Sequence, residues 1–381
     1  MVNFKRRLIE IQGIMEEQKL DLVVYGAGPD FQYLTGSQRE WRRGRDLISP
    51  ADCVFIPQEG EPTLLLGTDF TGQRDSSWIK DIRFIEMFED FQPTVNEILT
   101  DLVDDPTNVA IGEYTWGNMT LAIASSCKGA RVRSAEGLLD HLRMIKEPEE
   151  IKKLRKVAKL TDNVMEKISE EIEEGKTMNE MKLAIEAVGR TMGADDISFP
   201  GVALFHKSGT EANESIFNYG WDQKLQQKTS IAFDVGFVLD GYCSDWGRSL
   251  YFGKAEDHIT EAYRTVQTAV METVDAIGEE VHKTNEIFPA IEKVCDREGF
   301  GEYLRARVSN GLVGHQIGIE VHEDPWLRPS ENRELVDNMV FCVEPKLWHG
   351  GEYYLRVEDM ILIKNGKARS LTEYDRERFQ T

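Results

Sequence analysis

The chain has 381 residues, of which 41% are hydrophobic and 29% charged, proportions typical of a soluble globular protein and not of a disordered or membrane one. Its formal net charge of −22 disfavours nucleic acids and anionic membranes as partners, and no apolar run approaches the roughly 20 residues of a membrane span. The five cysteines are scattered and odd in number, which favours reduced thiols in the cytoplasm over a disulfide framework.

The first part of the chain alternates between helical and strand patterns. Apolar residues at helical spacing predict a helix over residues 3–19, and the sequence DLVVYG predicts a strand directly after it. Further strands are predicted at 53–56, 63–66, 82–85 and 109–111, and helices at about 93–103, 117–126 and 136–144. This alternation predicts an α/β domain over residues 1–142.

The second part begins with a long charged helix. Pro148 suits the first turn of that helix, and Glu149 and Glu150 suit its N-terminus. A second helix is predicted near 178–192, strands from about 198, helices at roughly 256–279 and 283–298, and strands again to about 365. We therefore expect residues 143–381 to form an α+β domain with a substantial antiparallel sheet.

Residues 231–248, IAFDVGFVLDGYCSDWGR, carry the first candidate site residues. The Asp240-Gly241 pair between two apolar runs predicts a hairpin, which can bring Asp234 and Asp245 opposite one another. Two carboxylates on a buried ladder repel each other, and a shared divalent cation would keep both ionised. An aspartate in a hairpin can also be an ordinary turn or cap residue.

Three later stretches hold acids and histidines in strand contexts. GLVGHQIGIEVHEDP contains His315 and His322, MVFCVEPKL contains Glu344 before Pro345, and YYLRVEDMILI places Glu358 inside an apolar strand. A carboxylate at the centre of a buried strand is unfavourable unless it is paired or bound to a metal. One such residue could be a satisfied core residue, but the joint occurrence favours a metal site.

The order and spacing of these residues resemble the pita-bread metallohydrolases, a group that includes prolidase, aminopeptidase P, methionine aminopeptidase and creatinase. YLTG at 33–36 and RMIKEPEEI at 143–151 are similar to the two-domain prolidase and creatinase branch. The resemblance implies an α/β N-terminal creatinase-like domain followed by an α+β pita-bread C-terminal catalytic domain.

The resemblance also implies a dinuclear metal centre. Its five ligands would be Asp234, Asp245, His315, Glu344 and Glu358. Asp245 and Glu358 would bridge two divalent ions, with Mn²⁺ or Co²⁺ expected and Zn²⁺ or Fe²⁺ as alternatives. Such ions lower the pKa of a bridging water and stabilise an oxyanion. Glu344 would double as a proton shuttle, and His322 would donate a hydrogen bond to the substrate.

Arginines are the candidate substrate-binding residues. Arg356 matches the family's RxED stretch and would orient a ligand or bind substrate, although a structural ion pair is an equal alternative. The loop SQREWRRGRDL contains Trp41, Arg42 and Arg45. In creatinase-like dimers this loop reaches the neighbouring active site, which implies a homodimer in which Arg45 or Arg42 captures a substrate carboxylate and Trp41 forms a wall. The alternative is a set of solvated arginines.

One segment departs from the family pattern. The peptidase and creatinase branches carry a further histidine upstream of the first metal aspartate, and Ser208–Gly220 contains none. We expect hydrolysis of an amide in a small carboxylate-bearing substrate, such as an Xaa-Pro dipeptide. The alternatives are a specialised amidohydrolase or lyase, similar to the enzymes that act on ectoine or dimethylsulfoniopropionate, or a non-catalytic binding protein.

Overall fold

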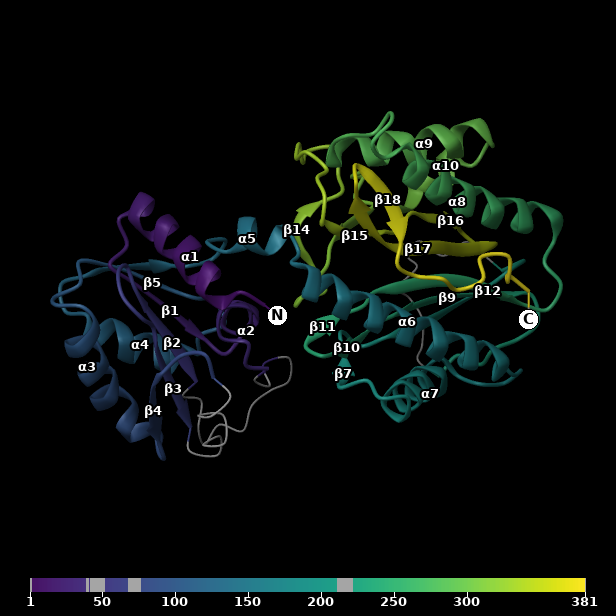
Figure 1. Ribbon diagram of the computed structural model, residues 1–381. Coiled ribbons are helices and arrows are strands. Elements are labelled where there is room, and N and C mark those ends of the chain that lie inside the picture. The colour runs from purple at the N-terminus through teal and green to yellow at the C-terminus, as the bar shows by residue number, and fades with distance from the viewer. Residues whose placement is uncertain (1, 39–40, 42–51, 68–76, 211–221, 381) are drawn as a thin grey trace. The chain divides into compact units, whose positions relative to one another are not determined.

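The computed structural model describes residues 2–38, 41, 52–67, 77–210 and 222–380. The chain forms two compact units, Met1–Arg143 and Met144–Thr381 (Figure 1). Each helix of the described residues is too short or too polar to cross a lipid bilayer. All five cysteines are buried and free of disulfide bonds.

The first unit is built on a six-stranded mixed sheet with the strand order β4-β3-β2-β1-β5-β6. Its strands are β1 (Leu22–Gly26), β2 (Cys53–Pro57), β3 (Thr63–Gly67), β4 (Asp81–Ile85), β5 (Asn108–Ile111) and β6 (Arg131–Ser134). β1 is parallel to β5 and antiparallel to β2. Its residues are buried on both faces, which explains the continuous apolar run LVVYG.

The described residues of this unit form the α-helices α1 (Phe4–Gln18), α2 (Pro29–Thr35), α3 (Phe91–Leu102), α4 (Gly117–Ser126) and α5 (Asp140–Met144), the last of which continues into the second unit. α1 begins after Asn3, whose side-chain oxygen accepts a hydrogen bond from the Arg6 amide at 3.1 Å. The helix predicted at 136–144 is shorter than expected. Gly137 has a φ of +76°, which an α-helix does not accommodate, so the helix begins only at Asp140.

The second unit contains a nine-stranded sheet, whose main path runs β14-β13-β15-β17-β12-β9-β8 while β16 and β18 both pair with β17. Its strands are β8 (Val202–Lys207), β9 (Thr229–Val235), β12 (Trp246–Phe252), β13 (Gly314–Gln316), β14 (Glu323–Trp326), β15 (Val340–Val343), β16 (Lys346–His349), β17 (Tyr353–Lys364) and β18 (Lys367–Ser370). A smaller sheet has the order β11-β10-β7, from β7 (Asp196–Ile197), β10 (Phe237–Leu239) and β11 (Tyr242–Cys243). The pairing within the large sheet is antiparallel, as the sequence predicts.

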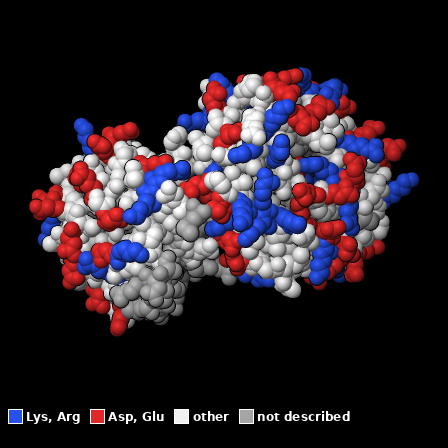
Figure 2. Space-filling model, in the orientation of Figure 1, with Lys and Arg blue, Asp and Glu red and all other residues white. Residues whose placement is uncertain are grey.

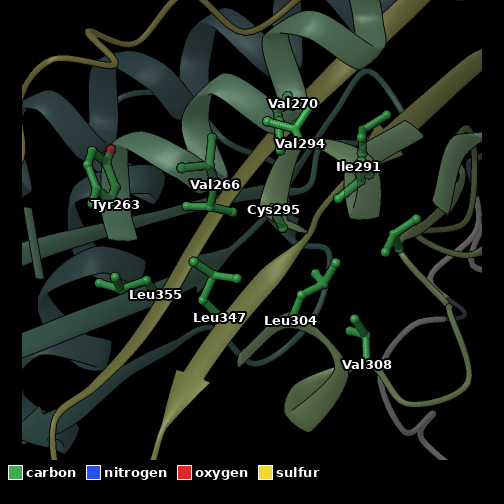
Figure 3. Close-up of a cluster of buried hydrophobic side chains, with 14 of the residues drawn as sticks. Tyr263, Val266, Val270, Ile291, Val294, Cys295, Leu304, Val308, Leu347 and Leu355 are labelled. Atoms are coloured by element: carbon green, nitrogen blue, oxygen red, sulfur yellow. The ribbon is translucent and has the colours of Figure 1, made fainter. Parts of the chain in front are cut away.

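Helices pack on this sheet in two groups (Figure 1). α6 (Pro148–Glu170) and α7 (Met178–Thr191) contribute to one apolar core with β8, β9 and β12. α8 (Asp257–Ala276), α9 (Ile287–Arg297) and α10 (Gly301–Arg307) contribute to another with β15, β16 and β17. Figure 3 shows this second core, in which Val266 and Val270 of α8 lie near Val294 of α9, with Leu347 and Leu355 from the strands.

Strand alternation determines which face of the sheet remains for polar residues. In β9, Ile231, Phe233 and Val235 point into the first core, so Asp234 points to the opposite face. In β17, Val357 and Ile361 point into the second core, so Glu358 points away from it. The acids of the predicted site therefore lie on the sheet face that the helices leave uncovered.

The predicted hairpin is present, with Leu239 paired to Tyr242. Asp240 and Gly241 have φ values of +52° and +78°, the positive pair that a type I′ turn requires. The expected pairing of the two aspartates is wrong in its register. Asp234 lies opposite Gly247, and Asp245 precedes β12, so the two acids are diagonal neighbours.

Acidic side chains are spread over the visible face of each unit, with basic side chains between them (Figure 2). Most of the carboxylates that produce the net charge of −22 are not buried, and their side chains contact solvent. Asp162 of α6 differs, because it is buried. Its two oxygens accept hydrogen bonds from Trp246 Nε1 at 3.0 Å and from the Glu373 amide at 2.6 Å.

Burial raises the pKa of Asp162 to about 6. Since this value exceeds that of an unfolded aspartate, about 3.9, the folded state binds the proton more tightly. That contribution to stability is complete below about pH 4 and is lost as the pH rises through about 6. We expect the stability of the wild type relative to Asp162→Asn to fall by roughly 2–3 kcal/mol from about pH 4 to pH 7. Urea unfolding of both proteins across this range measures the difference; parallel stability curves would contradict the prediction.

Candidate metal centre

Five strands or strand ends bring the predicted ligands to one region of the second unit. Asp234 is the penultimate residue of β9, Asp245 precedes β12, His315 lies in β13, Glu344 follows β15 and Glu358 lies in β17. Asp245, His315 and Glu358 are at most 4% exposed. These residues are distant in sequence, and the antiparallel register of the large sheet is what brings them together.

The innermost group consists of four side chains. Asp245, His315, Cys342 and Glu358 each offer one donor atom, and these atoms all lie within 4.8 Å of one another. His315 Nε2 is 3.5 Å from Asp245 Oδ2 and 3.9 Å from Glu344 Oε1. Glu344 therefore borders the group on its imidazole side.

Two basic side chains reach the remaining carboxylates. Arg356 contacts Asp234, and its Nη2 lies 2.9 Å from Glu344 Oε2 and 2.6 Å from Glu358 Oε2. Lys346 forms an ion pair with Glu344. Asp234 is thus joined to the other predicted ligands through the Arg356 guanidinium.

The acids of the centre have pKa values that are shifted in opposite directions. Burial and the nearby charge of Asp245 raise the pKa of Glu358 well above its usual range, and burial raises the pKa of Asp234. Burial opposes the ionisation of Glu344 as well, but Lys346 and Arg356 outweigh it and lower its pKa to about 2. One arginine and one lysine therefore do not compensate all the buried negative charge.

The unpartnered polar atoms show that the residues fit a cation. Asp245 Oδ1, His315 Nε2 and Glu358 Oε1 are buried and have no hydrogen-bond partner among the described residues. Buried polar atoms are normally satisfied, and each exception calls for an explanation such as an ion. Carboxylate oxygens and an imidazole nitrogen form a donor set that suits borderline divalent metals.

The His315 ring is oriented by its other nitrogen. Nδ1 lies 3.0 Å from the Gln316 carbonyl oxygen, which leaves Nε2 to face the carboxylates. Gln316 is held in turn by Lys146, whose Nζ lies 2.5 Å from Gln316 Oε1 and 3.1 Å from Glu323 Oε2. The lysine of the RMIKEPEEI stretch thus supports the strand pair that carries the histidine.

His322 lies at the solvent side of the centre. It is exposed, whereas His315 is buried, and the two rings are 4.4 Å apart in an edge-to-face arrangement. Trp326 stacks on His322 at 5.3 Å. Although His322 is exposed, the protein atoms around its ring partly desolvate it and lower its pKa, and the neighbouring His315 lowers that pKa further. An exposed imidazole beside the buried donors is accessible to a substrate.

Of the predicted arginine loop, the structure describes Ser37, Gln38 and Trp41. Trp41 is partly buried and contacts Tyr114 edge to face at 5.2 Å within the first unit. Arg42 and Arg45 lie outside the described residues, as does the Phe217–Tyr219 tract.

Sequence reasoning missed Cys342 and Lys346. Both alternate with Glu344 along the chain, and a period of two places side chains on one face of an extended strand. Their positions two residues before and two residues after Glu344, a suspected ligand, could have identified them as neighbours of the site.

Because Gly247 has no side chain, the side chains of Arg356 and Glu358 occupy the space beside its Cα atom. A Cβ at this position would lie 2.4 Å from Arg356 Nε and 2.7 Å from Glu358 Oε2. We expect Gly247→Ala to destabilise the protein by about 1–3 kcal/mol through overpacking, and to weaken metal binding because both side chains must shift. Thermal unfolding and metal titration measure these effects.

Gly13 provides the matched control for that substitution. It lies in α1, and a Cβ there would meet nothing within 4 Å. Gly13→Ala should stabilise the protein by about 0.5–1 kcal/mol, the usual gain in a helix interior. A Gly247→Ala protein with wild-type stability and metal affinity would contradict the packing described here.

Comparisons with known proteins identify relatives of both units of the chain. The description "Metallopeptidase family M24" matches residues 152–365, and "Creatinase/Prolidase N-terminal domain" matches residues 7–145. A Staphylococcus aureus protein described as an uncharacterized peptidase is 30% identical over 238 residues, which are 62% of this chain and 65% of that relative. The chain thus matches slightly less than two thirds of the length of the curated relative.

Solved structures share the whole fold. The dipeptidase from Pyrococcus horikoshii OT3 has a TM-score of 0.85 and 25% identity, with 98% of this chain and 100% of that chain covered. The recombinant prolidase from Thermococcus sibiricus has a TM-score of 0.84 and 23% identity, with both chains covered in full at 100%. The fold class and the family resemblance expected from the sequence are confirmed.

Proposed function

Because the chain belongs to metallopeptidase family M24 through residues 152–365, we propose that it is a dinuclear-metal-dependent hydrolase. Its substrate would be a small carboxylate-bearing amide, with Xaa-Pro dipeptides as the first class to test. The observation that carries the proposal is the set of buried, unpartnered donor atoms on Asp245, His315 and Glu358. The buried cysteines, which form no disulfide bonds, support a cytoplasmic location.

In this proposal, the five residues predicted from the sequence hold two divalent ions, Mn²⁺ or Co²⁺ in the first place: Asp234, Asp245, His315, Glu344 and Glu358. When bound, the ions would lower the pKa of a water between them and supply hydroxide near neutral pH. Asp245 and Glu358, the most buried carboxylates among these five residues, would be shared by the two ions. The four carboxylates and one imidazole match the ligand preference of these metals.

Side chains of the protein would carry out the proton transfer and stabilise the charge that develops on the substrate. Glu344 faces His315 through Oε1 and the basic pair through Oε2, so one of its oxygens could take a proton and return it to the leaving amine. His322, exposed beside the centre, would donate a hydrogen bond to the substrate carbonyl oxygen as that oxygen gains negative charge. Arg356 would hold Asp234, Glu344 and Glu358 in place.

Metal analysis and a substrate panel test the proposal. The purified protein is assayed for bound metal and then, with Mn²⁺ or Co²⁺, against Xaa-Pro dipeptides, longer Xaa-Pro peptides, ectoine and dimethylsulfoniopropionate. Proline release that depends on the added metal supports the proposed function. A protein that binds no metal and turns over none of these compounds overturns it and leaves the binding-protein alternative.

A specialised amidohydrolase or lyase is the second candidate. It is favoured by one feature of the sequence, the lack of a histidine in Ser208–Gly220, where the peptidase and creatinase branches have one. Metal binding together with turnover of ectoine or dimethylsulfoniopropionate, but of no peptide, would select this candidate.

The arginine loop gives a prediction about substrate capture. We propose a homodimer in which Arg45 or Arg42 of one subunit binds the substrate carboxylate and Trp41 forms a wall. Arg45→Ala should then raise KM at least about tenfold, as expected for a lost charge-assisted contact, without changing the metal content. Steady-state kinetics and metal analysis measure both, and light scattering reports the oligomeric state. Unchanged kinetics would remove this role.

A further inference from the structure

Cys342 lies within the candidate metal centre, where nothing in the sequence pattern required a thiol. Its Sγ belongs to the group of donor atoms that lie within 4.8 Å of one another. The side chain is fully buried. On β15, Cys342 is directly opposite His315 of β13 on one side and Met360 of β17 on the other. Cross-strand partners project from the same face of a sheet, so the register independently places the thiol beside the imidazole.

The surroundings of this thiol differ from those of an ordinary core cysteine. A buried cysteine usually behaves as a small hydrophobic residue with a weak S–H donor. Here its neighbours are Asp245, His315 and Glu358, each with a buried polar atom that has no partner among the described residues. One weak donor does not satisfy three such atoms. The four side chains together form a donor set that a cation completes.

The separations are compatible with ligation of one ion. Two ligands of a zinc ion lie at most the sum of their bond lengths apart, about 4.4 Å for a sulfur at about 2.3 Å and an oxygen or nitrogen at about 2.1 Å. The widest separation allowed within the group, 4.8 Å, exceeds this limit by only a few tenths of an ångström. Small rotations of the side chains would close the difference.

We propose that Cys342 is a sulfur ligand to one of the two ions of the proposed centre, an ion that Asp245, His315 and Glu358 also bind. This inference rests on the proposed metal-dependent function and adds a ligand to it. As the ion binds, the thiol releases its proton to solvent and the thiolate forms the metal–sulfur bond. A thiolate favours Zn²⁺ and Co²⁺ over the harder Mn²⁺. The cysteine therefore biases the choice of metal at this position.

Cobalt substitution tests the inference with a readout other than activity. Metal-free protein is titrated with Co²⁺, and its absorption is recorded in the visible and near-ultraviolet regions. The wild type should show visible ligand-field bands together with a near-ultraviolet sulfur-to-cobalt charge-transfer band. Cys342→Ser should keep the visible bands and lose the charge-transfer band. Its affinity for Zn²⁺ should fall at least about tenfold, and more than its affinity for Mn²⁺.

Cys243→Ala is the matched control. Cys243 is also buried and lies two residues before Asp245, but its Sγ donates to the Ile319 carbonyl oxygen at 3.2 Å and is outside the donor group. This variant should keep both absorption features. If Cys342→Ser does not fold, Cys342→Thr replaces it, because a β-branched residue of similar size suits a central strand.

The outcomes separate the two proposals. Cobalt that binds with visible bands but without a charge-transfer band overturns sulfur ligation and leaves the proposed metal-dependent function standing. A protein that binds no cobalt overturns both. A charge-transfer band that survives in the Cys342 variants, or that disappears in Cys243→Ala, overturns the assignment to Cys342.

Discussion

Replacing His315 by alanine is expected to weaken binding of the divalent metal and to lower kcat/KM by more than about 100-fold, while the protein stays folded. Residues that merely orient a ligand already cost about 10–100-fold when they are removed, and His315 is proposed as a ligand itself. Its Nε2 has no hydrogen-bond partner among the described residues, so loss of the ring removes the contact of Nδ1 with the Gln316 backbone carbonyl oxygen and leaves the fold in place. Metal content after dialysis, dipeptide hydrolysis and circular dichroism measure the three parts of this prediction.

His282→Ala serves as its control, because His282 is exposed and precedes α9, outside the donor group. That variant should bind metal and turn over substrate as the wild type does. A His315→Ala protein that retains both metal and activity would falsify the proposed centre.

Replacing Asp359 by alanine is expected to destabilise the protein by about 3–5 kcal/mol, because it leaves a buried arginine without its partner. Arg248 is fully buried and forms an ion pair with Asp359, which is 1% exposed. Asp359 also accepts hydrogen bonds from Arg376 Nη2 at 2.6 Å and from Thr372 Oγ1 at 2.8 Å. Since Glu358 is the neighbouring residue on β17, this cluster anchors the strand on the reverse side of the metal centre. Urea unfolding measures the loss.

Two further proteins control for this interpretation. The exposed pair Arg297–Glu272, with an N–O distance of 2.9 Å, should contribute less than about 1 kcal/mol when Glu272 is replaced by alanine. The double variant Arg248→Met/Asp359→Leu removes both charges and should recover most of the stability. If the double variant is as unstable as Asp359→Ala, the cause is packing and not the unpaired charge.

Much of the architecture could be predicted because it depends on local patterns. The run LVVYG, the capped helix of residues 4–18 and the Asp240-Gly241 turn each follow from residues close in sequence. The register error at the hairpin is one of counting. A two-residue turn at Asp240 and Gly241 pairs Leu239 with Tyr242, and continuing outward from that pair places Asp234 opposite Gly247, as the structure shows. The turn therefore determines the register by itself, and Asp245 lies two residues away from the position opposite Asp234.

The ligand types of the candidate centre could likewise be predicted, but their surroundings could not. Asp245, His315 and Glu358 stood out because a charged or polar residue in an apolar strand needs a partner. Arg356 was noted only through the family's RxED stretch, which does not say that it contacts three carboxylates. Lys146, which holds Gln316 behind the histidine, gave no comparable signal. A basic residue near a strand is common, and only the folded chain shows which acid it meets.

The sequence by itself determined which residues are available for the chemistry, because period-two alternation assigns each strand residue to one face and makes a buried acid conspicuous. The tertiary structure alone decided which of them meet. Strand register brings Cys342 opposite His315 and places Gly247 between Asp234 and Glu358, and such register arises from contacts between strands that are far apart in the chain. Convergence of donor atoms is a property of that packing, since no local pattern specifies the distance between two side chains on different strands.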